Sequence, residues 1–311
     1  MTATIQIEPA VTYARPSYEG ANIRTWIGFK HFIYLVEQAV LEWLLEQGSG
    51  ARQLFLEHGL GVEIVDCSVH LPAVLEIDDR VRAQVSTGKD RRLVVQLSVV
   101  RDGGEVTVLR GKVDLVLVRE PAATVHRPAP PALAGREVPD LAAASPVAAA
   151  PLVVPPGGTA RSVLAGQPAG YLWSWRARYF YCHFSDRVQH SGFVRALEEV
   201  VDRFLADRGI SVGRMLAERQ WIPVVSRARV QLLSAAQLEE TVHTVFTVVD
   251  ILRGVMFDAR MDCYVQRADQ LVPVATGRIL HGYAIAAGVD AGRLAQLDPD
   301  LIRALLAGGG A

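Results

Sequence analysis

Hydrophobic residues recur at helical spacing in two separate parts of the chain. The first stripe consists of Phe32, Leu35, Val36, Ala39, Val40, Trp43 and Leu44, and the second of Phe193, Ala196, Leu197, Val200, Val201, Phe204 and Leu205. Stripes this wide are typical of helices that are buried against a sheet. Gly48 and Gly209 follow the two stripes. They predict the helix ends, because glycine is common just after a helix C-terminus.

Alternating hydrophobic and polar positions after each helix predict β-strands. These strands cover residues 81–85, 93–99, 107–117, 241–250, 255–266 and 272–287. A turn at Asp102-Gly-Gly separates the second strand from the third. A last helix is expected from Pro299 to Leu306, because Asp298 is a good N-cap and proline is favoured at the first helical position.

The two halves of the chain align with each other. Glu37 corresponds to Glu198, an offset of 161 residues (198 − 37), and this offset holds through the helix, the following loop and the first strand. Further on, Gly111 corresponds to Gly277, an offset of 166 (277 − 111), so the extra residues lie in the hairpins of the second half. A register kept this long predicts an internal duplication rather than two unrelated amphipathic helices.

Proline, alanine and glycine dominate the segment between the halves, as in Pro128-Ala-Pro-Pro and Pro155-Pro-Gly-Gly. It has no hydrophobic period that would define a helix or strand, which is typical of a semi-extended linker. We therefore predict three parts. Residues 1–120 form the first half, residues 121–170 the linker, and residues 171–311 the second half with its C-terminal helix.

One long helix followed by a run of antiparallel strands, present twice, resembles the double hotdog arrangement. The resemblance implies an α+β fold in which a curved antiparallel sheet wraps each long helix. It also implies that the two hotdog units pair within one chain, as single-hotdog proteins do by dimerisation.

Polar residues gather where the chain enters the second long helix. Asp186 and His190 stand four residues apart at the expected helix start, and Glu199 follows about two turns later. A helix N-terminus offers unpaired N–H groups and the positive end of the helix dipole, which suit a polarised thioester carbonyl. Residues 186–190 resemble the Asp-x-x-Gly-His signature of hotdog thioesterases, with Gln189 in place of the glycine. That resemblance would make Asp186 the catalytic acid.

Residues 190–199 resemble a second hotdog thioesterase signature, His-Gly-Gly-x4-Leu-x-Asp. By position, it implies that Glu199 is the base or nucleophile and that Gly192 supplies an N–H to an oxyanion hole. The internal repeat favours Glu199 over Glu198 as the catalytic carboxylate, because Glu198 has a like partner, Glu37, in the first half. A residue kept in both halves is better explained by structure than by catalysis.

The first half lacks this polar set. At the offset of 161, Asp186, His190, Gly192 and Glu199 correspond to Thr25, Phe29, His31 and Gln38. The difference predicts one surviving site, located in the second half.

Aromatic and cationic side chains flank the expected site. We expect Tyr179, Tyr181 and Phe193 to line an acyl pocket, with core packing as the alternative. Arg187 and Arg195 are expected to meet the phosphate of coenzyme A or an acidic helix of a carrier protein, with a solvated rim as the alternative.

Each of these polar residues also has an explanation that involves no catalytic role. Asp186 is also explained as a turn residue or helix cap, and His190 as a cap or surface residue. Glu199 is also explained as an exposed carboxylate on a helix face.

Charge, cysteine content and motifs limit the partners, the location and the cofactors that are expected. Among 311 residues there are 32 basic and 33 acidic ones, a net charge of −1, which argues against nucleic acid or an anionic membrane as the main partner. Cys67, Cys182 and Cys263 have no metal-ligand spacing and predict no disulfide framework. Residues 1–10 lack the features of a signal peptide, so a cytoplasmic location is expected. Nucleotide-binding and zinc-protease motifs are absent, so we expect no cofactor and no metal.

Together with the resemblance, these observations predict an acyl-thioester hydrolase that acts on acyl-CoA or acyl-carrier-protein in fatty-acid or polyketide metabolism. Glu199 would activate water or attack, Gly192 would hold the oxyanion, and Asp186 with His190 would orient substrate or water. Alternatives are a dehydratase, isomerase or acyltransferase-decarboxylase acting on a carrier-bound chain, and a non-catalytic acyl-binding scaffold. A homodimer is compatible with the fused pair but not required by it.

Overall fold

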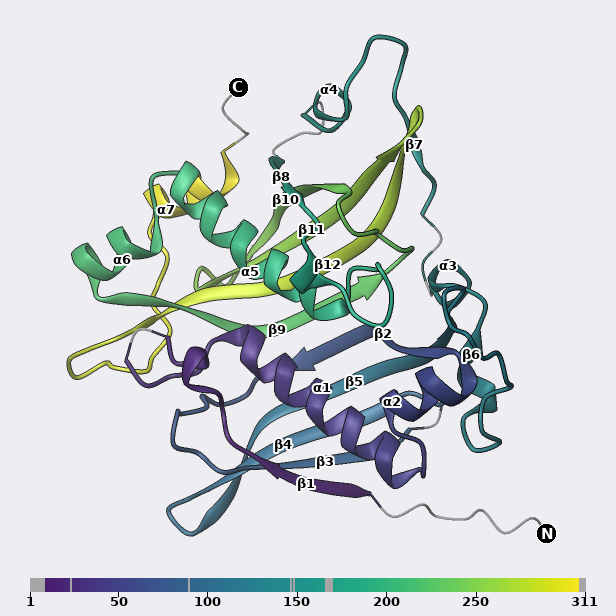
Figure 1. Ribbon diagram of the computed structural model, residues 1–311. Helices are drawn as coiled ribbons and strands as arrows, with labels where there is room; N and C mark the ends of the chain where they lie inside the picture. The colour runs from purple at the N-terminus through teal and green to yellow at the C-terminus, as the bar shows by residue number, and fades with distance from the viewer. Residues whose placement is uncertain are drawn as a thin grey trace. The chain divides into compact units, whose positions relative to one another are not determined.

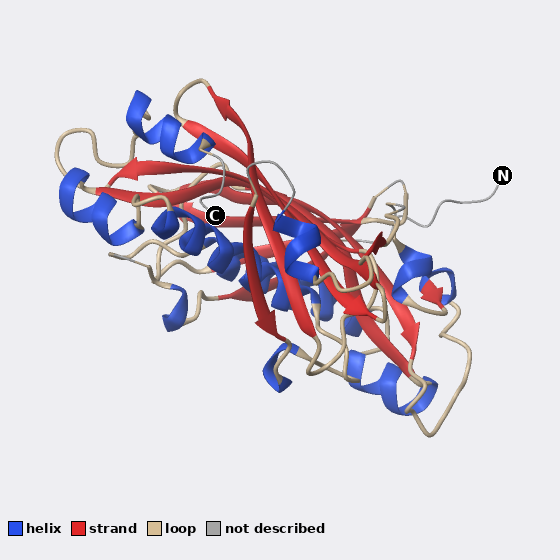
Figure 2. Ribbon diagram, turned by 90° about the horizontal axis from the view of Figure 1, so that it is seen from above, coloured by secondary structure: helices blue, strands red, loops and turns tan. Residues whose placement is uncertain are grey.

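The computed structural model describes residues 9–22, 24–88, 90–145, 147, 149–165 and 170–307. The chain divides into two units, Met1–Ala143 and Ala144–Ala311. In both units, strands hold more residues than helices (Figure 2). Most of the segment used to assess a signal peptide, and part of the predicted linker, lie outside the described residues.

The first unit contains one long helix, α1 (Phe29–Glu46), and a shorter helical segment made of α2 (Ala51–Gln53) and the π-helical turn η2 (Leu54–His58). Its strands are β1 (Ala10–Ala14), β2 (Leu60–His70), β3 (Val81–Thr87), β4 (Leu93–Arg101), β5 (Gly104–Arg119) and β6 (Glu137–Val138). Two 3-10 turns complete it, η1 (Tyr18–Gly20) and η3 (Ala134–Arg136), and α3 (Leu141–Ala144) lies at the unit boundary.

The second unit repeats this plan with α5 (His190–Asp207) as its long helix and α6 (Val212–Arg219) as the shorter one. Its strands are β7 (Leu152–Val153), β8 (Tyr171–Arg176), β9 (Trp221–Leu232), β10 (Thr241–Leu252), β11 (Met256–Arg267) and β12 (Gln270–Ile285). The remaining elements are α4 (Ala160–Ala165), the 3-10 turn η4 (Tyr179–Tyr181) and α7 (Pro299–Leu306).

Each long helix packs on its own antiparallel sheet (Figure 1). The strand order is β1-β3-β4-β5-β2 in the first unit and β9-β12-β11-β10-β8 in the second. All residues of the two predicted stripes are buried, which confirms the periodicity argument. The two helices end two residues before Gly48 and Gly209, and both glycines adopt the positive φ expected after a helix end.

The duplication extends to irregular features of the sheets. A β-bulge at Val65 in β2 recurs at Ser226 in β9, and a bulge at Val108 in β5 recurs at Val274 in β12. The first pair keeps the offset of 161 and the second the offset of 166. Bulges re-aim side chains and are specific to a position in the sheet. Their recurrence is therefore strong evidence that one ancestral unit was copied.

The change of offset lies in a hairpin, as predicted. The β3–β4 ladder ends at the pair Thr87–Leu93, whereas the β10–β11 ladder continues to the pair Leu252–Met256. The extra residues therefore lengthen the β10–β11 hairpin. Loop insertions are tolerated because lengthening a loop costs little closure entropy.

The C-terminal helix forms as its sequence predicts. The side chain of Asp298 accepts the N–H of Leu301 at 2.9 Å, and Pro299 occupies the first turn of α7. Arg219 also forms an ion pair with Asp298, which ties α7 to the end of α6.

The segment predicted to be a linker is more ordered than its composition indicates. The sequence predicts neither helix nor strand in 121–170, but the structure contains η3, β6, α3, β7 and α4 there. β6 pairs with β5 and β7 pairs with β12. A prediction from hydrophobic periodicity misses these elements, because tertiary contacts rather than a local periodic pattern stabilise them.

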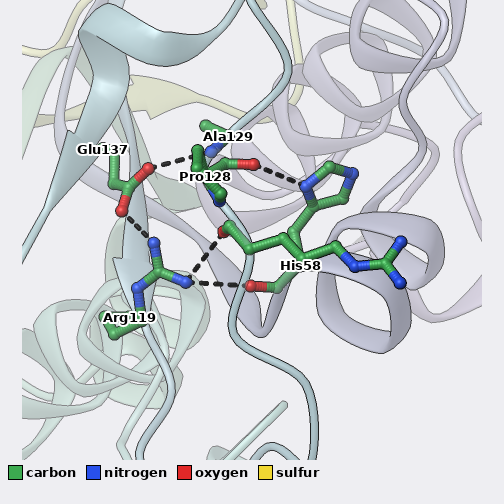
Figure 3. Close-up of polar contacts among 6 residues, drawn as sticks. His58, Arg119, Pro128, Ala129 and Glu137 are labelled. Atoms are coloured by element: carbon green, nitrogen blue, oxygen red, sulfur yellow. Dashed lines mark hydrogen bonds and ion pairs between the residues drawn. The ribbon is translucent and has the colours of Figure 1, made fainter.

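A polar network fastens the start of this segment to the first unit (Figure 3). Arg119 donates to the carbonyls of His58 and Arg127 at 2.9 Å each and forms an ion pair with Glu137. The other carboxylate oxygen of Glu137 accepts the N–H of Ala129 at 2.9 Å. These contacts lower the pKa of Glu137 despite the opposing effect of burial.

Candidate functional site

The loop that joins η4 to α5 is held firmly within the second unit. Two isolated antiparallel bridges fix it, Cys182 with Val188 and Arg187 with Gln237. The carbonyl of Asp186 also accepts the N–H of Leu238 at 2.6 Å. Asp186 is exposed, so its carboxylate is presented to solvent from a braced backbone. The thiol of Cys182 has a raised pKa, caused first by burial and then by the charge of Asp186.

The long helix begins where the sequence places it, at His190. The N-cap is Gln189, whose side chain makes no capping bond, so the alternative that Asp186 or His190 caps the helix is wrong. The side chain of Gln189 instead lies 2.6 Å from Nδ1 of His183. His183 belongs to the segment that enters the predicted helix, but the sequence analysis assigned it no role.

His190 is buried, with 3% of its surface exposed. Its Nε2 lies 3.2 Å from the carbonyl oxygen of Val230 on β9, which fits an N–H that donates to that carbonyl. This contact holds the first turn of α5 against the sheet. His190 therefore positions the helix start that lies beside the Asp186 loop.

Gly192 occupies a place where a side chain has no room. A Cβ there would lie 2.9 Å from Cγ1 of Val188 and 3.3 Å from Cδ1 of Tyr181. Its N–H donates to the carbonyl of Gln189 at 3.0 Å. The predicted oxyanion donor is thus already engaged in the first helical turn, and packing against Tyr181 explains the glycine.

Glu199 lies nine residues after His190, about 13 Å farther along the axis of α5 at 1.5 Å per residue. Arg203 donates to its Oε1 from both Nε and Nη2, at 2.9 and 2.7 Å. The side chain of Glu199 is 42% exposed. The structure thus places this carboxylate in a helix-face ion pair, and it does not bring Glu199 to the start of the helix beside Asp186.

The predicted substrate-binding residues separate into buried and exposed groups. Phe193 is buried and meets Trp175 edge to face, with ring centroids 6.1 Å apart. Tyr181 also packs on Trp175, at 5.0 Å. Arg187 is buried, whereas Tyr179 is 84% exposed.

Arg195 is partly buried and contacts the aromatic residues of η4. Its guanidinium lies 4.8 Å from the ring centroid of Tyr181, and its Nη2 donates to the carbonyl of Phe180 at 3.3 Å. The pKa of Tyr181 is raised, first by burial and then by Glu199, while Arg195 opposes the shift.

Sequence reasoning missed two buried polar residues of β12. His281 is 3% exposed and Tyr283 is fully buried, and neither Nδ1 of His281 nor the Tyr283 hydroxyl has a hydrogen-bond partner among the described residues. Burial lowers the pKa of His281 to about 3 and raises that of Tyr283. The offset of 166 would have identified them, because the first unit has Leu115 and Leu117 at these positions.

No group of three or more His, Cys, Asp or Glu side chains within the described ranges could hold a metal ion. In the same part of the chain, no helix is long and apolar enough to cross a membrane.

Comparison with known proteins identifies the fold. Residues 172–305 match the family model of the thioesterase-like superfamily. The chain has a tandem hotdog fold, and the matched residues lie in its second unit. This confirms the predicted fold class.

Two solved structures carry the fold assignment. The 12:0-ACP thioesterase from Umbellularia californica is 9% identical, with a TM-score of 0.58 over 88% of this chain and 97% of the other. An acyl-ACP thioesterase from Bacteroides thetaiotaomicron is 10% identical, with a TM-score of 0.53 over 88% of this chain and 97% of the other. No curated protein sequence matches the chain significantly.

Proposed function

We propose that the protein hydrolyses acyl thioesters and that Asp186 is its catalytic acid–base group. The observation that carries the proposal is an exposed carboxylate on a braced loop, four residues before the first residue of α5, in the unit that matches the thioesterase-like superfamily. The similar solved structures named above act on acyl-ACP. The substrates are therefore acyl groups on a carrier protein or on coenzyme A, as fatty-acid or polyketide metabolism supplies them.

In the proposed reaction, Asp186 takes a proton from a water molecule while the water oxygen attacks the thioester carbonyl. The carbon–sulfur bond then breaks, and the proton passes to the departing thiolate. The products are a free acid and a thiol. A positioned acid–base group of this kind contributes about 10²- to 10⁴-fold to the rate.

The start of α5 stabilises the negative charge that develops on the carbonyl oxygen. A helix leaves its first N–H groups without intrahelical acceptors and carries a partial positive charge at this end. Because the N–H of Gly192 is bonded to Gln189, we assign the donor role to Ser191, one residue earlier. His190 positions this turn through its contact with Val230.

Glu199 remains the alternative catalytic carboxylate, as the second sequence signature implies. Its ion pair with Arg203 supports a structural role, because two donors from Arg203 already engage one of its carboxylate oxygens. The comparison of Asp186 and Glu199 variants therefore decides which signature applies.

The test measures products by intact mass after incubation with a panel of acyl-CoA and acyl-carrier-protein thioesters. Asp186→Asn is expected to lower kcat about 10²- to 10⁴-fold, whereas Glu199→Gln keeps kcat within about threefold of wild type. Asp90→Asn, an exposed aspartate in the β3–β4 hairpin, is the matched control. Melting temperatures confirm that the variants are folded.

Other outcomes would redirect the assignment. Loss of activity in Glu199→Gln but not in Asp186→Asn would restore Glu199 as the catalytic residue. A thioester product of altered mass would indicate dehydration or decarboxylation, and a mass-neutral product separated by chromatography would indicate isomerisation. Binding of every thioester without turnover would indicate a non-catalytic scaffold.

A further inference from the structure

We propose that the exposed surface around η4 is the docking site of an acidic acyl carrier protein. This η4 surface consists of Arg176, Arg178, Tyr179, Phe180 and Arg195. The inference rests on the proposed function and commits to one form of substrate, an acyl group carried on a protein rather than on coenzyme A.

The first observation is two large apolar rings facing solvent on one short turn. Tyr179 is 84% exposed and Phe180 is 59% exposed. Aromatic residues and arginine are enriched at protein interfaces, where they supply most of the binding energy. A pair of adjacent exposed rings on a structured turn is therefore better explained by a partner than by folding.

The second observation is the cationic frame around these rings. Arg178 is exposed, and Arg176 is 45% exposed and lies 3.4 Å from Glu239. Arg195 donates to the carbonyl of Phe180 and lies 5.8 Å from its ring centroid, so it fixes the turn as well as adding charge. The net charge of the whole chain is −1, so this positive surface is a local feature. It complements an acidic helix.

The first unit lacks this combination on its equivalent turn. At the offset of 161, Arg178, Phe180 and Arg195 correspond to Ser17, Glu19 and Tyr34, whereas Arg176 corresponds to Arg15. Tyr18 keeps an exposed ring there, at 92%, but the acidic Glu19 stands beside it. The hotdog scaffold therefore does not require Arg178, Phe180 and Arg195, which only the unit with the candidate site has at these positions.

The third observation is the position of η4 next to the proposed reactive loop. Tyr181, the last residue of η4, accepts the N–H of Gln189 at 2.9 Å, and the thiol of Cys182 lies 3.4 Å from the carbonyl oxygen of Asp186. A protein bound on η4 would thus hold its thioester arm beside the start of α5. Coenzyme A would use the cations but has no need of two exposed rings.

The test compares one acyl group presented on holo carrier protein, on coenzyme A and on N-acetylcysteamine. For Arg178→Glu and Phe180→Ser, the ratio of kcat/KM on the carrier to kcat/KM on N-acetylcysteamine should fall about 10- to 100-fold. The matched controls are Arg110→Glu and Tyr18→Ser, two exposed residues of the first unit, and they should leave the ratio unchanged. Added salt should lower the rate on the carrier and leave the rate on N-acetylcysteamine unchanged.

Direct binding separates this proposal from the proposed function. Carrier protein loaded with a non-hydrolysable thioether analogue should bind wild type, and Arg178→Glu should weaken the Kd about tenfold. An unchanged Kd, or an equal loss of kcat/KM on carrier and coenzyme A, would overturn the docking site. Absence of hydrolysis of every thioester with normal carrier binding would instead overturn the proposed function alone.

Discussion

The two units of this protein share one backbone plan but fill it with different side chains at the start of the long helix. In the first unit Gly20 lies under His31, where a Cβ on Gly20 would come 2.9 Å from Cγ of that ring. In the second unit the sizes are exchanged, because Tyr181 stands at the position of Gly20 and Gly192 at that of His31. Both units therefore keep a contact between a ring and a glycine at these two positions, but the ring is a histidine in one unit and a tyrosine in the other.

The same contrast appears at the edge strands. Thr12 and Ala14 on β1 help to line a small pocket with Gln38 in the first unit. The equivalent residues of β8 are Trp173 and Trp175, which stack on each other at 6.0 Å. Large aromatic rings thus fill in one unit the space that small residues leave open in the other.

The largest effect should come from placing the first unit's residue in the second. Gly192→His puts an imidazole against Tyr181 and Val188, and overpacking should lower the free energy of unfolding by about 3 kcal/mol. Adding Tyr181→Gly recreates the pair of the first unit and should recover about 1–3 kcal/mol. Urea denaturation of the four members of the cycle measures this coupling. Additive losses would show that the exchange is not a packing pair.

A second comparison concerns the buried polar residues that only the second unit has. Tyr283→Phe removes a buried hydroxyl without a described partner and should raise the free energy of unfolding by about 1 kcal/mol. Thermal or urea unfolding checks the sign. A loss of stability would mean that the hydroxyl has a partner that stabilises the fold.

The pH dependence of stability offers a related test on His281. Its pKa is about 3 in the folded protein against 6.5 in the unfolded chain, so the unfolded state alone binds a proton between these values. The free energy of unfolding is therefore unaffected by His281 protonation above pH 6.5, and it falls as the pH is lowered toward 3. Compared with His281→Leu, which copies Leu115, wild type should lose about 1.4 kcal/mol per pH unit below 6.5. Parallel pH profiles for the two proteins would contradict this.

The smallest effect is expected for the ion pair on the face of α5. Arg203 and Glu199 are 47% and 42% exposed, and the first unit has Glu42 and Gln38 at these positions. Such exposed pairs are screened by solvent, so Arg203→Ala should change the free energy of unfolding by no more than about 0.5 kcal/mol. The effect should shrink at high salt. A larger change would assign Arg203 a role beyond the ion pair, through its contact with Trp173.

Parts of the site were readable in the sequence. The sequence predicted a helix start at these residues, and α5 begins at His190 with Asp186 in the loop before it. The ion pair of Glu199 with Arg203 could also have been anticipated, because residues at i and i+4 are neighbours on a helix. The engagement of the Gly192 N–H and the crowding by Tyr181 could not, because they depend on how η4 folds over the helix start.

The sequence by itself determined the two long helices, most of the strands of each sheet and the duplication, because hydrophobic periodicity and a constant offset are local, countable properties. Only the tertiary structure decided that the linker is folded. Its Glu137 forms an ion pair with Arg119, and the carbonyl of its Pro128 is hydrogen-bonded to His58, which is distant in the sequence. The tertiary structure also decided which carboxylate faces solvent from a braced loop. Contacts between distant residues depend on the packing of whole elements, and a linear pattern does not encode that packing in any short window.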